Sequence, residues 1–121
     1  MSYFNYRTIT TLEERKHKAE ELLKQYKDKV PIILEQFPKS HLPTLEKTRF
    51  LLQRNVLVEQ FLFLIRKKLN LNLESPLFLI TEKIIVLNSK QTMNDIYLKC
   101  KDKKDKFLYL YYTSDIPFGN K

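Results

Sequence analysis

The sequence predicts a single α+β domain: an antiparallel hairpin crossed by a helix, then further strands, with an extra helix in front. Two observations predict this class. Apolar residues recur at helical spacing in separated blocks, and short runs of β-branched and aromatic residues lie between those blocks. No internal repeat and no low-complexity linker divides the 121 residues, a length that suits one domain.

The first helix is predicted from residue 12 to about residue 26. Thr11 and Glu14 have the spacing of a capping box, in which each side chain satisfies a free backbone N–H at a helix start. Leucines follow on one face, and the other faces are basic. Two interpretations of the basic face stay open: a solvated surface or the border of a binding groove. Residues 1–10 are rich in aromatics and predict one helical turn or a loose arm.

Two strands follow and predict a hairpin with an irregular loop. Residues 29–35 are rich in β-branched side chains, and Pro31, which lacks an N–H, indicates the start of a strand or a sheet edge. Pro38 and Pro43 bracket a polar turn, and residues 49–54 form the second strand.

The central helix is predicted over residues 56–69, where apolar side chains recur at helical steps and three basic residues suit the negative C-terminal end. Short strands are expected at 77–80 and 84–87, and a charged turn at 102–106. A second helix is expected at 91–100, where Thr92 and Asp95 again have the spacing of a capping box. The last strand covers 107–113. Because both of its faces are apolar, we expect it inside the sheet.

The composition narrows the class of partner without choosing one. The formal net charge of +8 is spread along the chain, which favours a generally basic surface that attracts acidic peptides, anionic lipid or nucleic acid. One cysteine excludes an internal disulfide and fits a reducing compartment. With no apolar run of membrane-spanning length and no leader pattern, we expect neither secretion nor a span.

The sequence gives little support for a catalytic site or a metal site. A catalytic interpretation depends on Cys100, His17 and His41, yet Cys100 lies at the end of a predicted helix, where the dipole disfavours a thiolate. The two histidines and the cysteine do not occur at ligand spacing. We therefore expect no enzyme, no metal site and no cofactor.

Two non-enzymatic alternatives stay open. Phe107, Tyr109 and Tyr111 alternate along one strand, as base-stacking platforms of nucleic-acid-binding domains do, although no RNA-binding consensus surrounds them. A plain protein-interaction domain is the other alternative.

Gly119 is the only glycine in the chain, where ordinary usage of ~7% predicts about eight. It stands two residues from the end of the sequence, where the chain itself has little need of conformational freedom. Two interpretations stay open: an external partner with a narrow cleft, such as a protease or a transferase, requires this glycine, or it is an accidental residue of the tail.

Several blocks, in this order, resemble the ubiquitin-like autophagy modifiers, the GABARAP and microtubule-associated-protein light-chain family. They are residues 29–33, 50–51, 60–69, 77–78, 107–109 and 118–119, and the block from Phe61 to Leu69 is the most specific. The resemblance covers roughly residues 3–119. It implies a ubiquitin-like β-grasp, a mixed four-stranded sheet with helices. The domains would be an N-terminal helical extension (1–27), the β-grasp core (28–115) and a flexible conjugation tail (116–121).

The resemblance implies a modifier that is not an enzyme. A cysteine protease would trim the chain after Phe118 and Gly119, and ubiquitin-activating-like and conjugating-like enzymes would carry the glycine carboxyl. Transfer to phosphatidylethanolamine would move a cytoplasmic protein to the autophagosome membrane. No nucleic-acid partner is implied.

The family also recruits cargo receptors through short aromatic-x-x-aliphatic peptides that add a strand to a sheet edge. By position, the aromatic pocket would be lined by Lys18, Leu22, Pro31, Lys47, Arg49, Leu51 and Phe107. The aliphatic pocket would be lined by Phe50, Leu52, Val56, Phe61 and Leu64. From the residues alone, the apolar members are equally good core residues.

Some positions depart from the family pattern. Lys18 stands where close relatives carry an acidic residue beside the aromatic pocket, which shifts the expected preference toward peptides with acidic residues before the aromatic. Gln53 stands where proline is common, and residues 82–88 lack paired prolines. The match is loose over 1–11, so roles of that arm transfer weakly.

Overall fold

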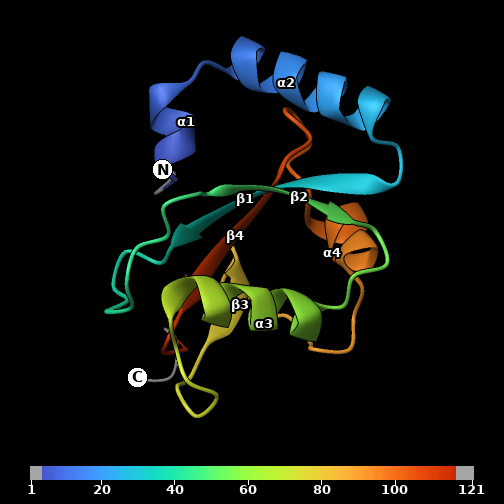
Figure 1. The fold of residues 1–121 in the computed structure, drawn as a ribbon. Helices are drawn as coiled ribbons and strands as arrows, with labels where there is room; N and C mark the ends of the chain where they lie inside the picture. The colour runs from blue at the N-terminus through green and yellow to red at the C-terminus, as the bar shows by residue number, and fades with distance from the viewer. Residues whose placement is uncertain (1–3, 117–121) are drawn as a thin grey trace.

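The computed structural model describes residues 4–116, and Phe118 and Gly119 lie outside this range (Figure 1). Four helices and four strands occur in the described part. In chain order they are α1 (Asn5–Ile9), α2 (Leu12–Gln25), β1 (Lys29–Gln36), β2 (Arg49–Gln53), α3 (Val58–Leu69), β3 (Phe78–Thr81), α4 (Met93–Cys100) and β4 (Leu108–Thr113).

The strands form one mixed sheet in the order β2-β1-β4-β3. β1 pairs antiparallel with β2 and parallel with β4, while β3 pairs antiparallel with β4. Every residue of β4 is buried, so the prediction that this strand lies inside the sheet is confirmed. The predicted mixed four-stranded sheet with an N-terminal helix is confirmed as well.

The sheet separates two layers of apolar packing. On one face, alternate residues of β1 and β4 pack with α3 and α4, with Phe61, Ile65 and Ile96 at the centre. On the other face, the intervening residues pack with α1 and α2, through Phe4, Tyr6 and Ala19 among others. Figure 1 shows α1 and α2 together on one side of the sheet and α3 on the other.

Two helices begin with the capping boxes that the sequence predicts. Thr11 and Glu14 form the capping box of α2, and Thr92 and Asp95 form that of α4. Asn70 caps the C-terminal end of α3 and takes the left-handed conformation with a φ of 60°. No helix within residues 4–116 combines the length and the apolar character that crossing a membrane requires.

The predicted strand at 84–87 is wrong. Only Val86 forms an isolated bridge, with Ile80. Ile84 has a φ of 63°, which a β-branched residue rarely adopts, and the Thr81 hydroxyl accepts hydrogen bonds from the Lys83 and Ile85 amides, both at 3.2 Å. The segment returns to β3 through this single bridge, with the Thr81 amide donating to the Ile85 carbonyl and the Leu87 amide to the Leu79 carbonyl, both at 3.0 Å.

Pro31 lies in β1, an inner strand, so the edge option for this proline is wrong. The register explains how the sheet accepts it. The Leu34 amide donates to the Thr48 carbonyl at 2.7 Å, and hydrogen-bonded pairs alternate along an antiparallel ladder. Pro31, opposite Leu51, therefore falls at a position where no N–H is needed for pairing with β2.

Candidate functional site

A pocket of about 350 Å³ opens between α2 and β2. Its lining residues are Lys18, Leu22, Lys47, Arg49, Phe50, Leu51 and Phe107. The pocket lies on the α1 and α2 side of the sheet, because Phe107 belongs to the core cluster on that face.

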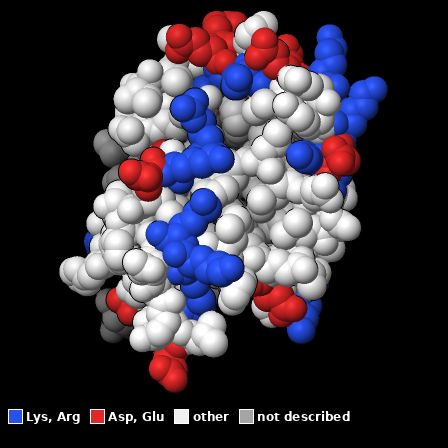
Figure 2. Space-filling view, in the orientation of Figure 1, with Lys and Arg blue, Asp and Glu red and all other residues white. Residues whose placement is uncertain are grey.

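The lining is apolar at the floor and cationic at the mouth. Phe107 is 2% exposed and belongs to the core cluster on this face, so it forms the base, whereas the Phe50 ring packs against Phe61 in the cluster on the opposite face. Lys18, Lys47 and Arg49 are exposed. Figure 2 shows Lys and Arg side chains gathered between α2 and α3 on the face that carries β2, while acidic side chains gather at the top of the view, over α2.

β2 is at the edge of the sheet and pairs with β1 alone within residues 4–116. Since hydrogen-bonded pairs alternate, and Thr48 is bonded to Leu34, the N–H and C=O groups of Arg49 and Leu51 point away from β1. These are the groups that an added strand would bond. The pocket therefore opens beside a strand edge that still has hydrogen-bonding capacity.

The structure brings together all the residues predicted for the aromatic pocket except Pro31, which is buried in β1. Phe50, predicted for the aliphatic pocket, lines this pocket too.

The residues predicted for the aliphatic pocket lie on or beside β2 and on α3, in the other core cluster. Phe61 is 1% exposed and packs edge-on against Phe50, with ring centroids 5.5 Å apart, so it is a core residue. Leu52, Val56 and Leu64 are half-buried against the same cluster. These three are therefore partly accessible at the surface.

The family model described as autophagy protein Atg8, ubiquitin like, matches residues 14–119. The chain belongs to the Atg8 family. It is 38% identical over 109 residues to autophagy-related protein 8D of Oryza sativa subsp. japonica, covering 90% of this chain and 92% of that protein. Its structure is similar to the crystal structure of Trypanosoma brucei ATG8, with a TM-score of 0.84 and 37% identity over 90% of this chain and 92% of that one.

Family membership fixes the coarse function. Atg8-family proteins are ubiquitin-like proteins of autophagy and, as a family, are modifiers rather than enzymes. The nucleic-acid alternative is not favoured, because Phe107, Tyr109 and Tyr111 are 2%, 2% and 3% exposed and so offer no stacking platform. In the described range no group of three or more His, Cys, Asp or Glu side chains lies together as metal ligands would.

Asp105 holds the walls of the pocket together in this Atg8-family chain, and sequence reasoning missed it. Its carboxylate is 1% exposed. One oxygen accepts from the Phe107 amide at 2.9 Å, and the other accepts from Arg15 Nε at 2.9 Å and the Tyr109 hydroxyl at 2.5 Å. Burial and this carboxylate raise the pKa of Tyr109 well above its ordinary value. The only sequence signal for this role was the position of Asp105, two residues before the predicted pocket residue Phe107.

Arg7 attaches α1 to the rest of this Atg8-family fold, a role that the sequence did not reveal. Its guanidinium donates to Glu82 and, at 2.8 Å, to Asp102, and it lies 3.7 Å from the centroid of the Tyr109 ring. Glu35 accepts from the backbone amides of Asn5 and Tyr6 at 2.7 and 3.0 Å, which satisfies the start of the helix. The arm is thus held by charge and by aromatic packing.

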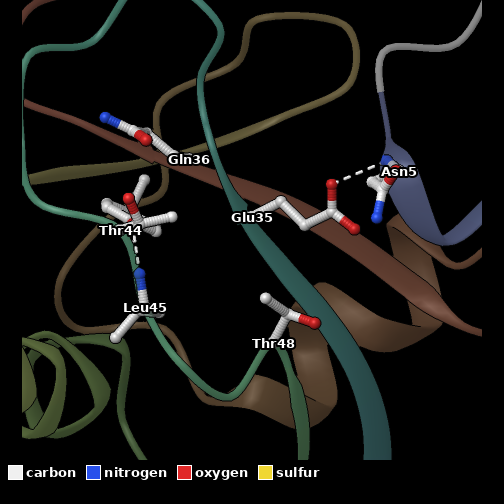
Figure 3. Close-up of a pocket in the computed structure, with 7 residues that line it drawn as sticks. Asn5, Glu35, Gln36, Thr44, Leu45 and Thr48 are labelled. Atoms are coloured by element: carbon white, nitrogen blue, oxygen red, sulfur yellow. Dashed lines mark hydrogen bonds between the residues drawn. The ribbon is translucent and has the colours of Figure 1, made fainter.

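A second pocket, of about 270 Å³, lies where β1 ends (Figure 3). It is lined by Asn5, Glu35, Gln36, Thr44, Leu45, Thr48 and Tyr112. The Tyr112 hydroxyl accepts from the Leu45 amide at 3.0 Å and donates to the Pro43 carbonyl at 2.8 Å. This tyrosine therefore fixes the loop that leads into β2 and its edge.

Proposed function

We propose that this Atg8-family chain is a modifier that joins phosphatidylethanolamine through Gly119 and recruits cargo receptors through short aromatic-x-x-aliphatic peptides. The observation that carries the proposal is a pocket with an apolar floor and a cationic mouth beside the outer edge of β2, in a chain of this family. We place the protein in the cytoplasm, and on the autophagosome membrane after conjugation.

The conjugation half of the proposal rests on the family and on the single glycine. A cysteine protease hydrolyses the bond after Gly119 and releases Asn120-Lys121. An activating enzyme and a conjugating enzyme carry the glycine carboxyl as a thioester. The ethanolamine amine then attacks the thioester carbonyl, forms the amide and releases the enzyme thiol. Phosphatidylethanolamine brings two acyl chains, and two lipid anchors hold a protein on a membrane where one is marginal.

The proposed recruitment of cargo receptors depends on the outer edge of β2 and on the side chains of both its faces. The peptide adds a strand that bonds the outward groups of Arg49 and Leu51. Its aromatic side chain enters the pocket over Phe107, and its aliphatic side chain packs near the half-buried Leu52, Val56 and Leu64. Acidic residues before the aromatic meet Lys18, Lys47 and Arg49.

The conjugation proposal is tested in a reaction reconstituted from the processing protease, the two enzymes and vesicles containing phosphatidylethanolamine. Gly119→Ala should give no lipidated product, because a Cβ obstructs a narrow cleft. A chain ending at Gly119 should be lipidated without the protease and remain dependent on both enzymes. Lipidation of the Gly119→Ala chain at the rate of the natural chain would contradict the assignment.

A further inference from the structure

The end of α4 and the turn that follows it are rich in lysine. Over residues 99–106, which we call the lysine turn, the lysines are Lys99, Lys101, Lys103, Lys104 and Lys106. The backbone folds back on itself, because the Asp102 amide donates to the Phe107 carbonyl at 2.8 Å and the Lys106 amide donates to the Asp102 carbonyl at 2.9 Å. The Tyr97 hydroxyl also donates to the Lys106 carbonyl, at 2.7 Å. The lysines are therefore gathered on a compact turn that hydrogen bonds hold in shape.

The two aspartates of the turn are bonded within the fold and do not pair with its lysine side chains. The Asp102 carboxylate accepts from the backbone amides of Lys104 and Asp105, at 2.8 and 3.0 Å. It also accepts from the Arg7 guanidinium at 2.8 Å, while the buried Asp105 pairs with Arg15. Among the described residues, no lysine ammonium group of the turn lies within 4.0 Å of a carboxylate oxygen. The positive charge of the turn is thus not neutralised by ion pairs.

Most of this charge is exposed. Lys99, Lys103, Lys104 and Lys106 are exposed, and Lys101 is half-buried with its Nζ 5.4 Å from the centroid of the Tyr97 ring. Figure 1 shows the segment between α4 and β4 reaching toward α2, at the start of β4. The chain continues toward Gly119 from the other end of this strand. A partner of the lysine turn and a lipid on Gly119 therefore approach from opposite ends of β4.

The surroundings of the lysines favour one class of anionic partner. Nucleic-acid platforms stack bases on exposed aromatic rings, but Tyr97 and Phe107 are only 4% and 2% exposed. Helices that lie on membranes present a broad apolar face, whereas Leu98 is the one large apolar side chain exposed within residues 93–106. A lysine ammonium group is a compact point charge, without the planar fork of arginine that matches phosphate. An acidic polypeptide fits this surface best.

We propose that the lysine turn binds an acidic segment of a partner protein, with aspartate and glutamate carboxylates opposite Lys99, Lys103 and Lys104. None of residues 99–106 lines the pocket between α2 and β2, so the turn is a second, separate interaction surface. The inference goes beyond the proposed function and does not depend on it, because a chain with a peptide at β2 can hold the acidic segment at the same time. Exposed charges make this association electrostatic, so it weakens as salt screens them.

The test is isothermal titration calorimetry of the full chain with a peptide of glutamate, aspartate, glycine and serine residues, which brings no aromatic or aliphatic side chain to the pocket. The peptide should bind at about 0.1 M salt, where a Debye length of ~10 Å limits the effect of distant charges. Its affinity should fall by about tenfold or more at about 1 M salt, where the Debye length is ~3 Å.

Paired charge reversals locate the binding surface. Lys99→Glu combined with Lys104→Glu should weaken the acidic peptide by about tenfold, through lost attraction and new repulsion. Lys47→Glu combined with Arg49→Glu changes the net charge equally and should leave the affinity within about twofold, because these residues lie at the pocket. An acidic-flanked phenylalanine-x-x-leucine peptide should show the opposite pattern, and its binding to the first variant shows that this variant is folded.

Each outcome decides a named claim. No binding of the acidic peptide, or equal weakening by the two pairs of substitutions, overturns the lysine turn as a site. Single-stranded RNA, or vesicles of phosphatidylserine and phosphatidylcholine, could instead bind more tightly than the acidic peptide and lose this binding in the Lys99→Glu and Lys104→Glu chain. That result overturns the acidic polypeptide as the partner. Failure of the phenylalanine-x-x-leucine peptide alone overturns the proposed recruitment of receptors and leaves this inference standing.

Discussion

The carboxylate of Asp105 joins α2 to the floor of the pocket through Arg15, with 2.9 Å between Arg15 Nε and Asp105 Oδ2. Both side chains are largely buried, at 12% and 1% exposed. α2 itself contributes a single fully buried side chain, Ala19, to the core. The ion pair is therefore a principal attachment of the helix that carries Lys18 and Leu22.

Replacing Arg15 by glutamine should lower the free energy of unfolding by about 3 kcal/mol, because removing one partner leaves a buried charge unpaired. Urea unfolding followed by circular dichroism measures the change. Lys16→Gln, one position along and exposed, is the matched control and should stay within about 0.5 kcal/mol of the natural chain. If both variants lost the same free energy of unfolding, the Arg15–Asp105 ion pair would not be a principal attachment of α2.

The free energy of unfolding should also fall in acid, because Asp102 becomes protonated. Burial alone raises the pKa of this carboxyl, but the backbone amides of Asp105 and Lys104 and the Arg7 guanidinium outweigh burial and hold its pKa below the ordinary value. The native state thus binds this proton less readily than the unfolded state. The stabilisation is present above about pH 4 and is lost as the pH falls through the lowered pKa.

Unfolding measured from pH 6 to pH 2 checks this effect. Asp102→Asn should flatten the acid loss, whereas Asp28→Asn, at an exposed position, should leave the profile as steep as before. If the free energy of unfolding fell with pH equally steeply in Asp102→Asn and in the natural chain, Asp102 would not be the carboxyl responsible.

Lys106 has a φ of 72°, in the left-handed region that side chains with a Cβ disfavour. Lys106→Gly should relieve this cost and raise the free energy of unfolding by about 0.5–1 kcal/mol, net of the greater entropy that glycine has when unfolded. Lys104→Gly, two residues earlier and not at positive φ, should instead destabilise. Thermal melts of the two variants should move in opposite directions, and movement together would contradict the strain argument.

The sequence was informative where the cause is local. Thr11 with Glu14, and Thr92 with Asp95, predicted helix starts because a capping box needs only neighbours. The two apolar faces of β4 predicted an inner strand for a similar reason. The segment 84–87 failed because its apolar character does not reveal the positive φ of Ile84.

The contacts that shape the site could not be found in the same way. Arg7 and Asp102 are 95 positions apart, and Arg15 and Asp105 are 90 apart, so only the tertiary fold brings them together. The aromatic-pocket residues were assigned by resemblance. The structure places all of them except Pro31 around one pocket, and peptide binding there stays a prediction.

Charge reversal at the mouth of the pocket should weaken acidic-flanked peptides. Lys47→Glu combined with Arg49→Glu should cost about 1–3 kcal/mol of binding free energy, through lost attraction and new repulsion. Lys99→Glu combined with Lys104→Glu changes the net charge equally at exposed positions outside the pocket and serves as the control. Calorimetric titration with a single peptide compares them, and equal weakening by both pairs would indicate a general charge effect.

An NMR titration of the 15N-labelled full chain with an acidic-flanked phenylalanine-x-x-leucine peptide tests the central claim most directly. Strand addition at β2 predicts large amide shifts at Arg49 and Leu51, whose N–H groups acquire partners, with further shifts at Lys18 and Leu22 across the pocket. The same peptide with alanine in place of phenylalanine should leave the chemical shifts of those amides unchanged. Shifts confined to β3 and α4, with Arg49 and Leu51 unmoved at saturation, would contradict the account.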